Sequence, residues 1–323
     1  MIKLVIEKRH ITRDNNACFK QIAQKYVGFF GKPNNAISVE RGKECIMEKK
    51  VTLAGHRGWR AKYPENTMIG FRKVLELDID AIEMDVHMTK DYHIVVCHDA
   101  NLGRTTDTKG LIYQMTLDEV RKADAGIKHG EEFKGEKVPT LEEFLELMAT
   151  RPDVKVMLEL KDYPEDLGDF AYASAELSLS LCRKYGIFGS DRLTVITFSA
   201  GLCAWLRTRY TKNDFYIHGF YPKSKMKGYQ NDDPYKYYDE VCLFNSGDKT
   251  PQGMPVTYPT PVADKARFTE FALMGIKPCV HYGMCTDEEI YKASYENGAL
   301  GFTCDHPDIC GEILDRIGAR KLK

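Results

Sequence analysis

The sequence predicts an α/β fold, namely a TIM (β/α)8 barrel with a small insertion after the second barrel strand and an N-terminal extension. Two observations support this prediction. From Val51 onward, short apolar runs alternate with helical patterns, as in chains that build a parallel sheet. Eight of these runs fit buried strands, and eight strands with helices between them close into a barrel.

The predicted barrel strands are short runs rich in Val, Ile, Leu and Phe. In chain order they span 52–56, 81–86, 154–160, 193–198, 215–220, 240–244, 277–282 and 299–304. The segments between them place apolar residues at helical spacing. The clearest helices span 67–77, 141–149, 170–185, 201–210, 263–274 and 287–297.

One apolar run, 93–98, breaks this alternation. It follows Val86 after only six residues, whereas the crossover between two parallel strands needs a dozen or more. We therefore predict that 93–98 is the antiparallel strand of a hairpin on the rim of the barrel. The segment 102–140 then combines turn signals with one short helix at 117–123, which indicates an insertion.

Residues 1–50 are predicted to be an N-terminal extension, and 51–323 the barrel domain. The extension contains a strand-like start at 2–6, an amphipathic helical pattern at 17–30 and a polar stretch rich in Gly, Pro and Asn. We find no signal-peptide pattern and no run of about 20 apolar residues that could span a membrane. The ten cysteines show no Cys-x-x-Cys spacing, so we expect reduced thiols in a cytoplasmic protein.

The composition narrows the class of partner. Hydrophobic residues make up 43% and charged residues 29% of the 323, which is typical of a globular protein with a core. The 46 Lys and Arg residues nearly balance the 47 Asp and Glu residues. Binders of nucleic acid or of membrane surfaces usually carry a basic excess, so we expect a small-molecule partner instead. The composition leaves homo-oligomerisation open.

Ionisable residues stand at the ends of the first three predicted barrel strands. In chain order these are His56 and Arg57, Glu83 and Asp85, and Glu159 and Lys161. Active sites of such barrels lie at the C-terminal ends of the strands, and residues two apart on a strand point to the same face. Three carboxylates from neighbouring strand ends form an all-oxygen set that suits Mg²⁺ or Ca²⁺.

Each of these residues also has an ordinary structural interpretation. Glu83 alone could be an exposed polar residue or the partner of a lysine, and Asp85 could cap a helix or turn. Lys161 could be solvated, and His56 could be a core histidine with its hydrogen bonds satisfied. However, two ionisable groups at each of three successive strand ends are costly to bury without a ligand or a metal. Together they therefore predict one site.

The chain resembles the glycerophosphodiester phosphodiesterase family over residues 52–315. The resemblance rests on a series of motifs in the family's order and is looser across 200–280. The motifs are His56-Arg57-Gly58, Pro64-Glu65-Asn66-Thr67, Ile82-Glu83-Met84-Asp85-Val86, Thr89-Lys90-Asp91, Val95-Val96-Cys97-His98-Asp99, Arg104-Thr105-Thr106, Asp124-Ala125-Gly126, Val138-Pro139-Thr140-Leu141, Leu158-Glu159-Leu160-Lys161 and a closing segment from Gly298 to Pro307. The insertion at 102–140 also matches the family.

This resemblance implies metal-dependent hydrolysis of glycerophosphodiesters to glycerol 3-phosphate and an alcohol. It also implies roles for the matched residues. His56 and His98 would be the catalytic acid–base pair, Glu83, Asp85 and Glu159 the ligands of one divalent metal ion (Mg²⁺, Ca²⁺ or Mn²⁺), and Arg57, Lys161, Tyr282 and Glu65 the phosphate or substrate contacts. Tyr282 stands where the family usually has a pocket-lining tryptophan. Glu65 could touch the substrate or orient a catalytic group.

The roles of the two histidines, the cap of the first helix and the role of Asp305 can also be predicted, with alternatives for each. We expect His56 to act as the base and His98 as the acid, on a nucleophile that is either water or the vicinal hydroxyl of the substrate. Asn66 or Thr67 is expected to cap the following helix. Asp305, after the last predicted strand, could support the site or cap the turn before Pro307.

Two rival functions remain at this point. A lysophospholipase D-like enzyme would share the barrel, and the segments 17–30 and 220–244 could then line an acyl chain or pack in the core. Sphingomyelinase D, in contrast, lacks an insertion like 102–140 and is a secreted protein with disulfides. A non-catalytic barrel that binds phosphate esters is the other class, and the presence of both histidines and all three carboxylates disfavours it.

Overall fold

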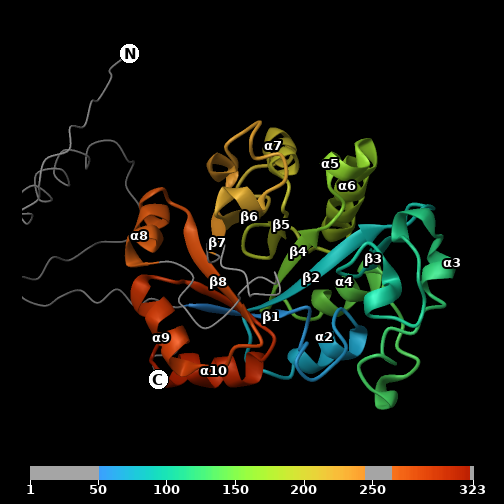
Figure 1. Ribbon diagram of the computed structural model, residues 1–323, viewed down its shortest axis with the longest axis horizontal. Helices are drawn as coiled ribbons and strands as arrows, with labels where there is room; N and C mark the ends of the chain where they lie inside the picture. Colours follow the sequence, from blue (N-terminus) through green and yellow to red (C-terminus); the bar gives the residue numbers. More distant parts are fainter. Residues whose placement is uncertain (1–50, 244–263, 321–323) are drawn as a thin grey trace, which may run out of the picture. The chain divides into compact units, whose positions relative to one another are not determined.

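Eight parallel strands form the centre of the computed structural model, which describes residues 51–243 and 264–320 (Figure 1). They are β1 (Thr52–His56), β2 (Ala81–Met88), β4 (Lys155–Leu160), β5 (Leu193–Ile196), β6 (Tyr216–Tyr221), β7 (Glu240–Leu243), β8 (Lys277–Gly283) and β9 (Gly301–Cys304). Neighbours in the sheet follow the chain order, and β1 pairs with both β2 and β9. This pairing closes the sheet, so the predicted TIM barrel is confirmed.

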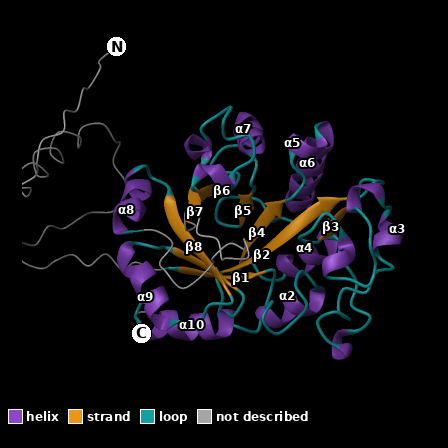
Figure 2. Cartoon of the chain, viewed as in Figure 1, coloured by secondary structure: helices purple, strands orange, loops and turns teal. Residues whose placement is uncertain are grey.

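Helices surround the strands (Figure 2). They are α2 (Met68–Val74), α4 (Leu141–Ala149), α5 (Pro164–Leu167), α6 (Asp169–Lys184), α7 (Ala200–Arg209), α8 (Lys265–Leu273), α9 (Glu288–Asn297) and α10 (Pro307–Arg316). The predicted helices agree within a few residues, but α5 and α10 were not predicted. The start of α10 lacks a capping side chain, so one of the usual signals for a helix start is missing there.

Some predictions lie outside the described residues. These are the extension 1–50, with its segments 2–6 and 17–30, and residue 263, at which the predicted helix 263–274 begins. Residue 244, the last residue of both the predicted strand 240–244 and the segment 220–244, also lies outside them. Among the residues described, no helix combines the length and the apolar character that a membrane crossing requires. The eight cysteines in residues 51–243 and 264–320 are free and buried.

The predicted rim hairpin is present. Strand β3 (Ile94–Val96) pairs antiparallel with β2, so that Val86 lies opposite Val96 and Met88 opposite Ile94. The turn between the strands is tight, because the Thr89 N–H donates to the His93 carbonyl over 2.8 Å. The hairpin therefore brings His98 back towards the barrel without adding a ninth barrel strand.

The insertion after this hairpin has its own small core. Its buried residues are Val95, Cys97, Leu102, Ile112, Val120, Ala123, Ala125 and Val138. The short helix α3 (Leu117–Val120) is fixed by a capping box, in which the side chains of Thr116 and Glu119 each bond to the other's backbone. Because Val95 lies in β3 and Cys97 follows it, this core also supports the segment that carries His98.

Thr67 rather than Asn66 caps the first helix. Its hydroxyl accepts a hydrogen bond from the Gly70 N–H at the start of α2. Asn66 adopts the left-handed conformation, with φ of 56°, and its side-chain amide donates to Asp85 Oδ2 over 2.9 Å. The loop 64–67 is therefore attached at one end to α2 and in its middle to β2.

Candidate active site

The register of the sheet gathers the predicted charged residues at one end of the barrel. His56 lies opposite Glu83 in the β1–β2 pair, and Asp85 lies opposite Glu159 in the β2–β4 pair. Apart from Asp85, these side chains line a pocket of about 130 Å³ at the carboxyl ends of the strands. A larger, shallow depression between α6 and α7 contains none of the predicted residues.

The pocket has two unlike walls. The charged wall, from the ends of β1, β2 and β4 and from the segment after β3, consists of His56, Arg57, Glu83, His98, Glu159 and Lys161. The other residues that line the pocket are mostly apolar, and we call them the far wall. It consists of Met157, Ile196, Phe198, His218, Phe220, Cys242, His281 and Thr303. Within it, the rings of Phe198 and Phe220 stack with centroids 3.6 Å apart.

Three carboxylates converge at the base of the charged wall. Oxygen atoms of Glu83, Asp85 and Glu159 lie within 4.8 Å of one another, and all three residues are buried. Glu83 Oε1 and Asp85 Oδ1 are buried without a hydrogen-bond partner. Burial raises the pKa of Glu83 well above its ordinary value, and the charges of Asp85 and Glu159 raise it further. This donor set fits a divalent cation, which would occupy the unbonded oxygens and offset their repulsion.

Two cations border this carboxylate group. Arg57 Nε lies 3.3 Å from Asp85 Oδ2, and Lys161 Nζ lies 2.8 Å from Glu159 Oε1 and 3.7 Å from Asp85 Oδ1. Burial would raise the pKa of Asp85, but the charges of Arg57 and Lys161 hold it well below its usual range. Both cations also reach the pocket, where they can contact a phosphate group.

The turn after β1 sets the position of Arg57. Its backbone is left-handed, with φ of 53°, a conformation that non-glycine residues rarely adopt. The Arg57 N–H donates to Glu83 Oε2 over 3.0 Å, and its guanidinium donates to Glu65 Oε1 over 2.9 Å. These contacts direct the side chain across the end of β2.

Each histidine is held by an aspartate through Nδ1. His56 Nδ1 lies 2.6 Å from Asp305 Oδ1, and His98 Nδ1 lies 2.5 Å from Asp99 Oδ1. The Nε2 atom of His98 accepts from Lys161 Nζ over 3.0 Å, because an ammonium can only donate. Both rings therefore carry their proton on Nδ1 and turn Nε2 towards the other charged groups.

Burial lowers the pKa of both histidines. For His56 the charge of Arg57 adds to this effect, while Asp305 opposes it. For His98 the charge of Asp85 opposes the effect of burial, whereas Lys161 adds to it. The neutral imidazole is consequently favoured in the absence of an anionic ligand.

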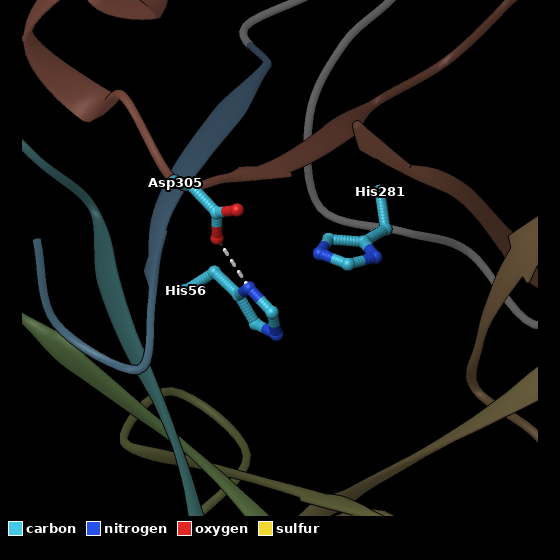
Figure 3. A group of neighbouring side chains, drawn as sticks. All are labelled: His56, His281 and Asp305. Atoms are coloured by element: carbon cyan, nitrogen blue, oxygen red, sulfur yellow. Dashed lines mark hydrogen bonds and ion pairs between the residues drawn. The ribbon is translucent and has the colours of Figure 1, made fainter. Parts of the chain in front are cut away.

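Tyr282 does not reach the pocket, and this prediction is corrected. Its side chain is buried in the outer core, where its ring packs against Tyr291 and its hydroxyl hydrogen bonds with Ser294 Oγ. The preceding residue, His281, lines the pocket instead, with its ring centroid 4.3 Å from that of His56 (Figure 3). Successive residues of a strand face opposite sides, so only one of the two can face the interior of the barrel.

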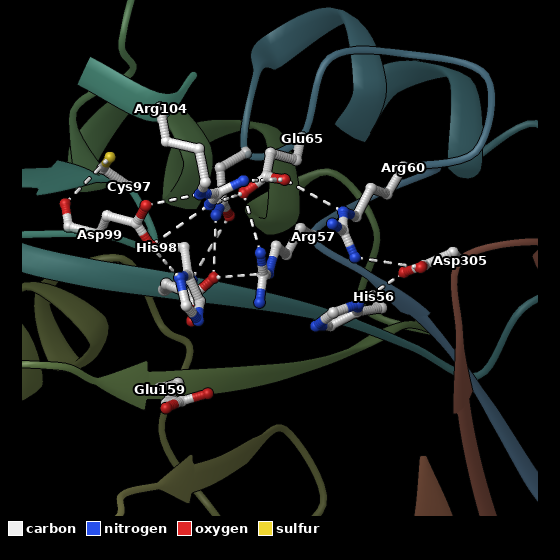
Figure 4. Close-up of polar contacts among 12 residues, drawn as sticks. His56, Arg57, Arg60, Glu65, Cys97, His98, Asp99, Arg104, Glu159 and Asp305 are labelled. Carbon is white, nitrogen blue, oxygen red and sulfur yellow. Dashed lines mark hydrogen bonds and ion pairs between the residues drawn. The ribbon is translucent and has the colours of Figure 1, made fainter. Parts of the chain in front are cut away.

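Glu65 does not line the pocket either. Its carboxylate lies behind the charged wall, where it accepts hydrogen bonds from Arg57, Arg60 and Arg104 (Figure 4). Of its two predicted roles, the orientation of a catalytic group fits this position. The sequence alone did not indicate that His281, Arg60 or Arg104 belong to the site. Arg104 was visible only as part of a motif, and no local pattern singled out the other two.

Comparison with known proteins gives a consistent family. The model of the glycerophosphoryl diester phosphodiesterase family matches residues 56–307. The chain is 46% identical to a glycerophosphodiester phosphodiesterase of Caldanaerobacter subterraneus subsp. tengcongensis over 112 residues, which are 35% of this chain and 46% of that protein. It is 26% identical to lysophospholipase D GDPD1 of Rattus norvegicus over 310 residues, covering 88% of this chain and 91% of that protein. Against the first of these relatives, the chain spans about half of the relative's length.

Solved structures share the fold. A phosphodiesterase of Oleispira antarctica, in complex with the product sn-glycerol-3-phosphate, superposes with a TM-score of 0.66 at 22% identity, covering 82% of this chain and 96% of that one. A glycerophosphoryl diester phosphodiesterase described as putative, from Silicibacter pomeroyi, gives a TM-score of 0.67 at 22% identity, covering 84% and 96%. At this level of identity the likeness establishes the barrel fold alone.

Proposed function

We propose that this chain, which belongs to the glycerophosphoryl diester phosphodiesterase family, hydrolyses glycerophosphodiesters to glycerol 3-phosphate and an alcohol. One observation carries the proposal. Two histidines, each bonded through Nδ1 to an aspartate, border the same pocket as two cations and two carboxylates, Glu83 and Glu159, which converge with the buried Asp85. These are the groups needed to bind a phosphodiester and to move a proton on and off its oxygens.

We propose Glu83, Asp85 and Glu159 as the ligands of one divalent cation. Their two unbonded oxygens and their all-oxygen chemistry support Mg²⁺, Ca²⁺ or Mn²⁺. When bound, the cation would offset the negative charge of the phosphodiester and stabilise the charge that develops in the transition state.

The residues of the charged wall would then have separate roles in the reaction. Arg57 and Lys161 contact the anionic oxygens and draw the phosphorus towards the histidines. His56 Nε2 takes the proton of the nucleophile, which is water or the vicinal hydroxyl of glycerol, and Asp305 stabilises the imidazolium that forms. With the vicinal hydroxyl as nucleophile, a cyclic phosphate is an intermediate.

His98 would protonate the leaving alkoxide. For this it must carry a proton on Nε2 as well as on Nδ1. The carboxylate of Asp99 favours that charged form, and so does a bound phosphodiester anion. Binding of the substrate phosphate would also draw Lys161 away from His98 Nε2, which frees that nitrogen for the leaving group.

The direct test is a substrate screen. The chain is incubated with glycerophosphocholine, glycerophosphoethanolamine and glycerophosphoinositol in the presence of Mg²⁺, Ca²⁺ or Mn²⁺, and released glycerol 3-phosphate is measured. We expect turnover with at least one combination. We also expect His98→Ala to lower the rate by about 10²–10⁴-fold, the usual contribution of a general acid.

His93→Ala is the matched control, because His93 lies on the same hairpin with 46% of its side chain exposed. It should keep the wild-type rate. Full activity in a folded His98→Ala protein would contradict the assignment of the acid. No turnover of any of these substrates by the folded protein would contradict the proposed function.

A lysophospholipid is the second candidate substrate. It is favoured by the similarity to a lysophospholipase D along 88% of this chain, and the far wall offers Ile196, Phe198 and Phe220 as apolar surface. The two candidates are separated by the ratio of kcat/KM for glycerophosphocholine to that for lysophosphatidylcholine. A ratio well below one would identify the lysophospholipid as the preferred substrate.

We further propose that residues 51–323 form the catalytic domain in a cytoplasmic protein. The described barrel begins at Val51, and the buried free thiols support a reducing compartment. Activity of a 51–323 fragment, measured with the same substrates, tests the boundary of the domain.

A further inference from the structure

A continuous series of hydrogen bonds runs from one histidine to the other behind the charged wall (Figure 4). On one side, Asp305 Oδ1 holds His56 Nδ1, and Asp305 Oδ2 accepts from Arg60 Nη1 over 3.1 Å. Arg60 Nε then donates to Glu65 Oε2 over 3.0 Å. We call the residues Arg60 and Asp305 the His56 arm.

The other side has the same order of groups. Asp99 Oδ1 holds His98 Nδ1, and Asp99 Oδ2 accepts from Arg104 Nε. Arg104 donates to both oxygens of Glu65, with Nη2 at 2.7 Å from Oε1 and Nη1 at 3.0 Å from Oε2. We call Asp99 and Arg104 the His98 arm. The two arms therefore meet at the carboxylate of Glu65.

The charges of this network balance. Glu65 also accepts from Arg57 Nη1. The network therefore contains as many carboxylates as guanidinium groups, namely those of Glu65, Asp99 and Asp305 and those of Arg57, Arg60 and Arg104. Burial would raise the pKa of Glu65, but the hydrogen bond from Arg104 and the charges of Arg57 and Arg60 hold it well below its usual range. Glu65 is consequently an anion that can accept from all three arginines at once.

The backbone fixes Glu65 between the arms. The next residue, Asn66, is bonded to β2 through Asp85, and Thr67 caps α2. The Asn66 N–H also donates to the Arg57 carbonyl over 3.1 Å. The side chain of Glu65 is only 10% exposed. Because the two residues that follow it are attached to β2, to the Arg57 carbonyl and to α2, Glu65 offers a rigid point to which both arginines can bond.

We propose that Glu65 is a positioning residue that orients both histidines at once, through Arg60 and Asp305 on one side and through Arg104 and Asp99 on the other. This inference rests on the proposed function for its catalytic consequence. Each aspartate has one oxygen on its histidine and the other on its arginine, and Arg104 Nη2 also donates to Asp99 Oδ1 over 3.3 Å. The rotation of each aspartate is therefore fixed only while its arginine is held. Loss of Glu65 releases both arginines, and both imidazole rings then lose their fixed direction.

The first test reads the orientation without reference to activity. The chain is labelled with ¹⁵N-histidine, and the ring nitrogen shifts of His56 and His98 are compared between variants. Arg60→Met should move the signals of His56, Arg104→Met those of His98, and Glu65→Gln those of both. If Glu65→Gln moves neither signal in a folded protein, the proposal is overturned, whether or not the chain is a phosphodiesterase.

The second test measures catalysis with two leaving groups. Glycerophosphocholine releases an alkoxide that needs a proton, whereas a p-nitrophenyl ester of glycerol 3-phosphate releases an anion that does not. We expect each arm variant to lower kcat on glycerophosphocholine by about 10- to 100-fold, the loss typical of a partner behind a functional group. KM should change much less than kcat.

The leaving group then separates the arms. On the nitrophenyl ester the defect of Arg104→Met should nearly vanish, while that of Arg60→Met should persist. The reverse pattern supports the positioning role and exchanges the acid and the base between the two histidines. Equal defects of both variants on both substrates indicate a purely structural role and overturn the proposal.

Arg316→Met is the matched control, because it breaks an exposed ion pair, with Glu288, outside the network. It should leave both the histidine signals and kcat unchanged. A wild-type protein that hydrolyses neither substrate would refute the proposed function alone, since the nitrogen signals would still report whether Glu65 links the two rings.

Discussion

The charged wall and the far wall of the pocket differ in how they are built. The charged wall is held by many polar contacts, and most of its residues bond to a group of opposite charge. The far wall is held by packing, as in the stacked rings of Phe198 and Phe220. A wall of bonded charges tolerates little change, whereas a packed apolar wall can change size and shape at modest cost.

This difference suggests how the two walls share the reaction. Every charged group proposed for catalysis comes from one contiguous part of the sequence, from His56 to Lys161, with the exception of Asp305. The far wall comes mainly from β5 to β8. We therefore expect changes in the charged wall to affect the rate of the chemical step, and changes in the far wall to affect the choice of substrate.

Removal of the metal should have the largest effect, because it acts on the charged wall as a whole. EDTA should abolish release of glycerol 3-phosphate, and added Mg²⁺, Ca²⁺ or Mn²⁺ should restore it. Glu159→Gln should raise the metal concentration for half-maximal activity, by about 10- to 100-fold if its effect matches that of other metal-site changes. Turnover that persists in the chelator would show that the carboxylates have another role.

The pH profile tests the charged wall through one residue. The pKa of His56 lies below 6.5, because burial and Arg57 lower it, and a base must be unprotonated to act. Activity is therefore lost as pH falls through this lowered pKa, so the acid side of the kcat/KM profile should fall about tenfold per pH unit, beginning at a pH below the ordinary imidazole pKa of about 6.5.

Asp305→Asn removes a group that raises this pKa, and the fall should then begin at a lower pH. A decline that already begins above pH 6.5 in the wild type would argue against His56 as the base.

A change in the far wall should have a smaller and different effect. Phe198→Leu removes the stacked contact with Phe220, which is worth about 0.5–1.5 kcal/mol for an aromatic pair. That contact contributes to stability, whereas the smaller apolar surface left for the substrate should raise KM by about 2- to 10-fold, a loss of about 0.4–1.4 kcal/mol in affinity, with little change in kcat. Phe188→Leu removes a ring that contacts Tyr210 and Phe215 outside the pocket, so it should not alter KM. A loss in kcat for Phe198→Leu would show that the walls are not separate in function.

Loss of a helix cap should have the smallest effect on the protein, and two such caps, one beside the charged wall and one away from it, can be compared directly. Thr67 caps α2 beside the charged wall, and Asp287 caps α9, which follows β8. Replacing either by Ala should cost about 1 kcal/mol and lower Tm by about 2–4 °C. Only Thr67→Ala should also lower kcat, because it loosens the loop that carries Glu65. An equal effect of both on kcat would remove the distinction.

The sequence predicted the charged wall well because its geometry is local. The alternation of side chains along β2 places Glu83 and Asp85 on one face. The short spacing after Val86 was sufficient to predict a hairpin, and β3 confirms it. Strand order and register then follow from the barrel, so the residues at its first three strand ends had to meet.

The far wall and the network behind the site could not be predicted in this way. The choice between His281 and Tyr282 depends on the pairing of β8 with β9, whose register shifts between His281 and Gly283. The bond from Arg60 to Asp305 joins residues that are 245 positions apart. Glu65 could be recognised as a residue that orients catalytic groups, but its partners are defined only by the folded chain.

The closure of the barrel has a consequence for the order in which the protein becomes competent during synthesis. The chain carries all three carboxylates, both cations and both histidines once Lys161 has left the ribosome. His56, however, obtains the partner of its Nδ1 only when Asp305 arrives at the end of β9, which pairs with β1. Until β9 pairs with β1, the nascent chain therefore holds the charged groups of the site but lacks the partner that aligns the His56 imidazole.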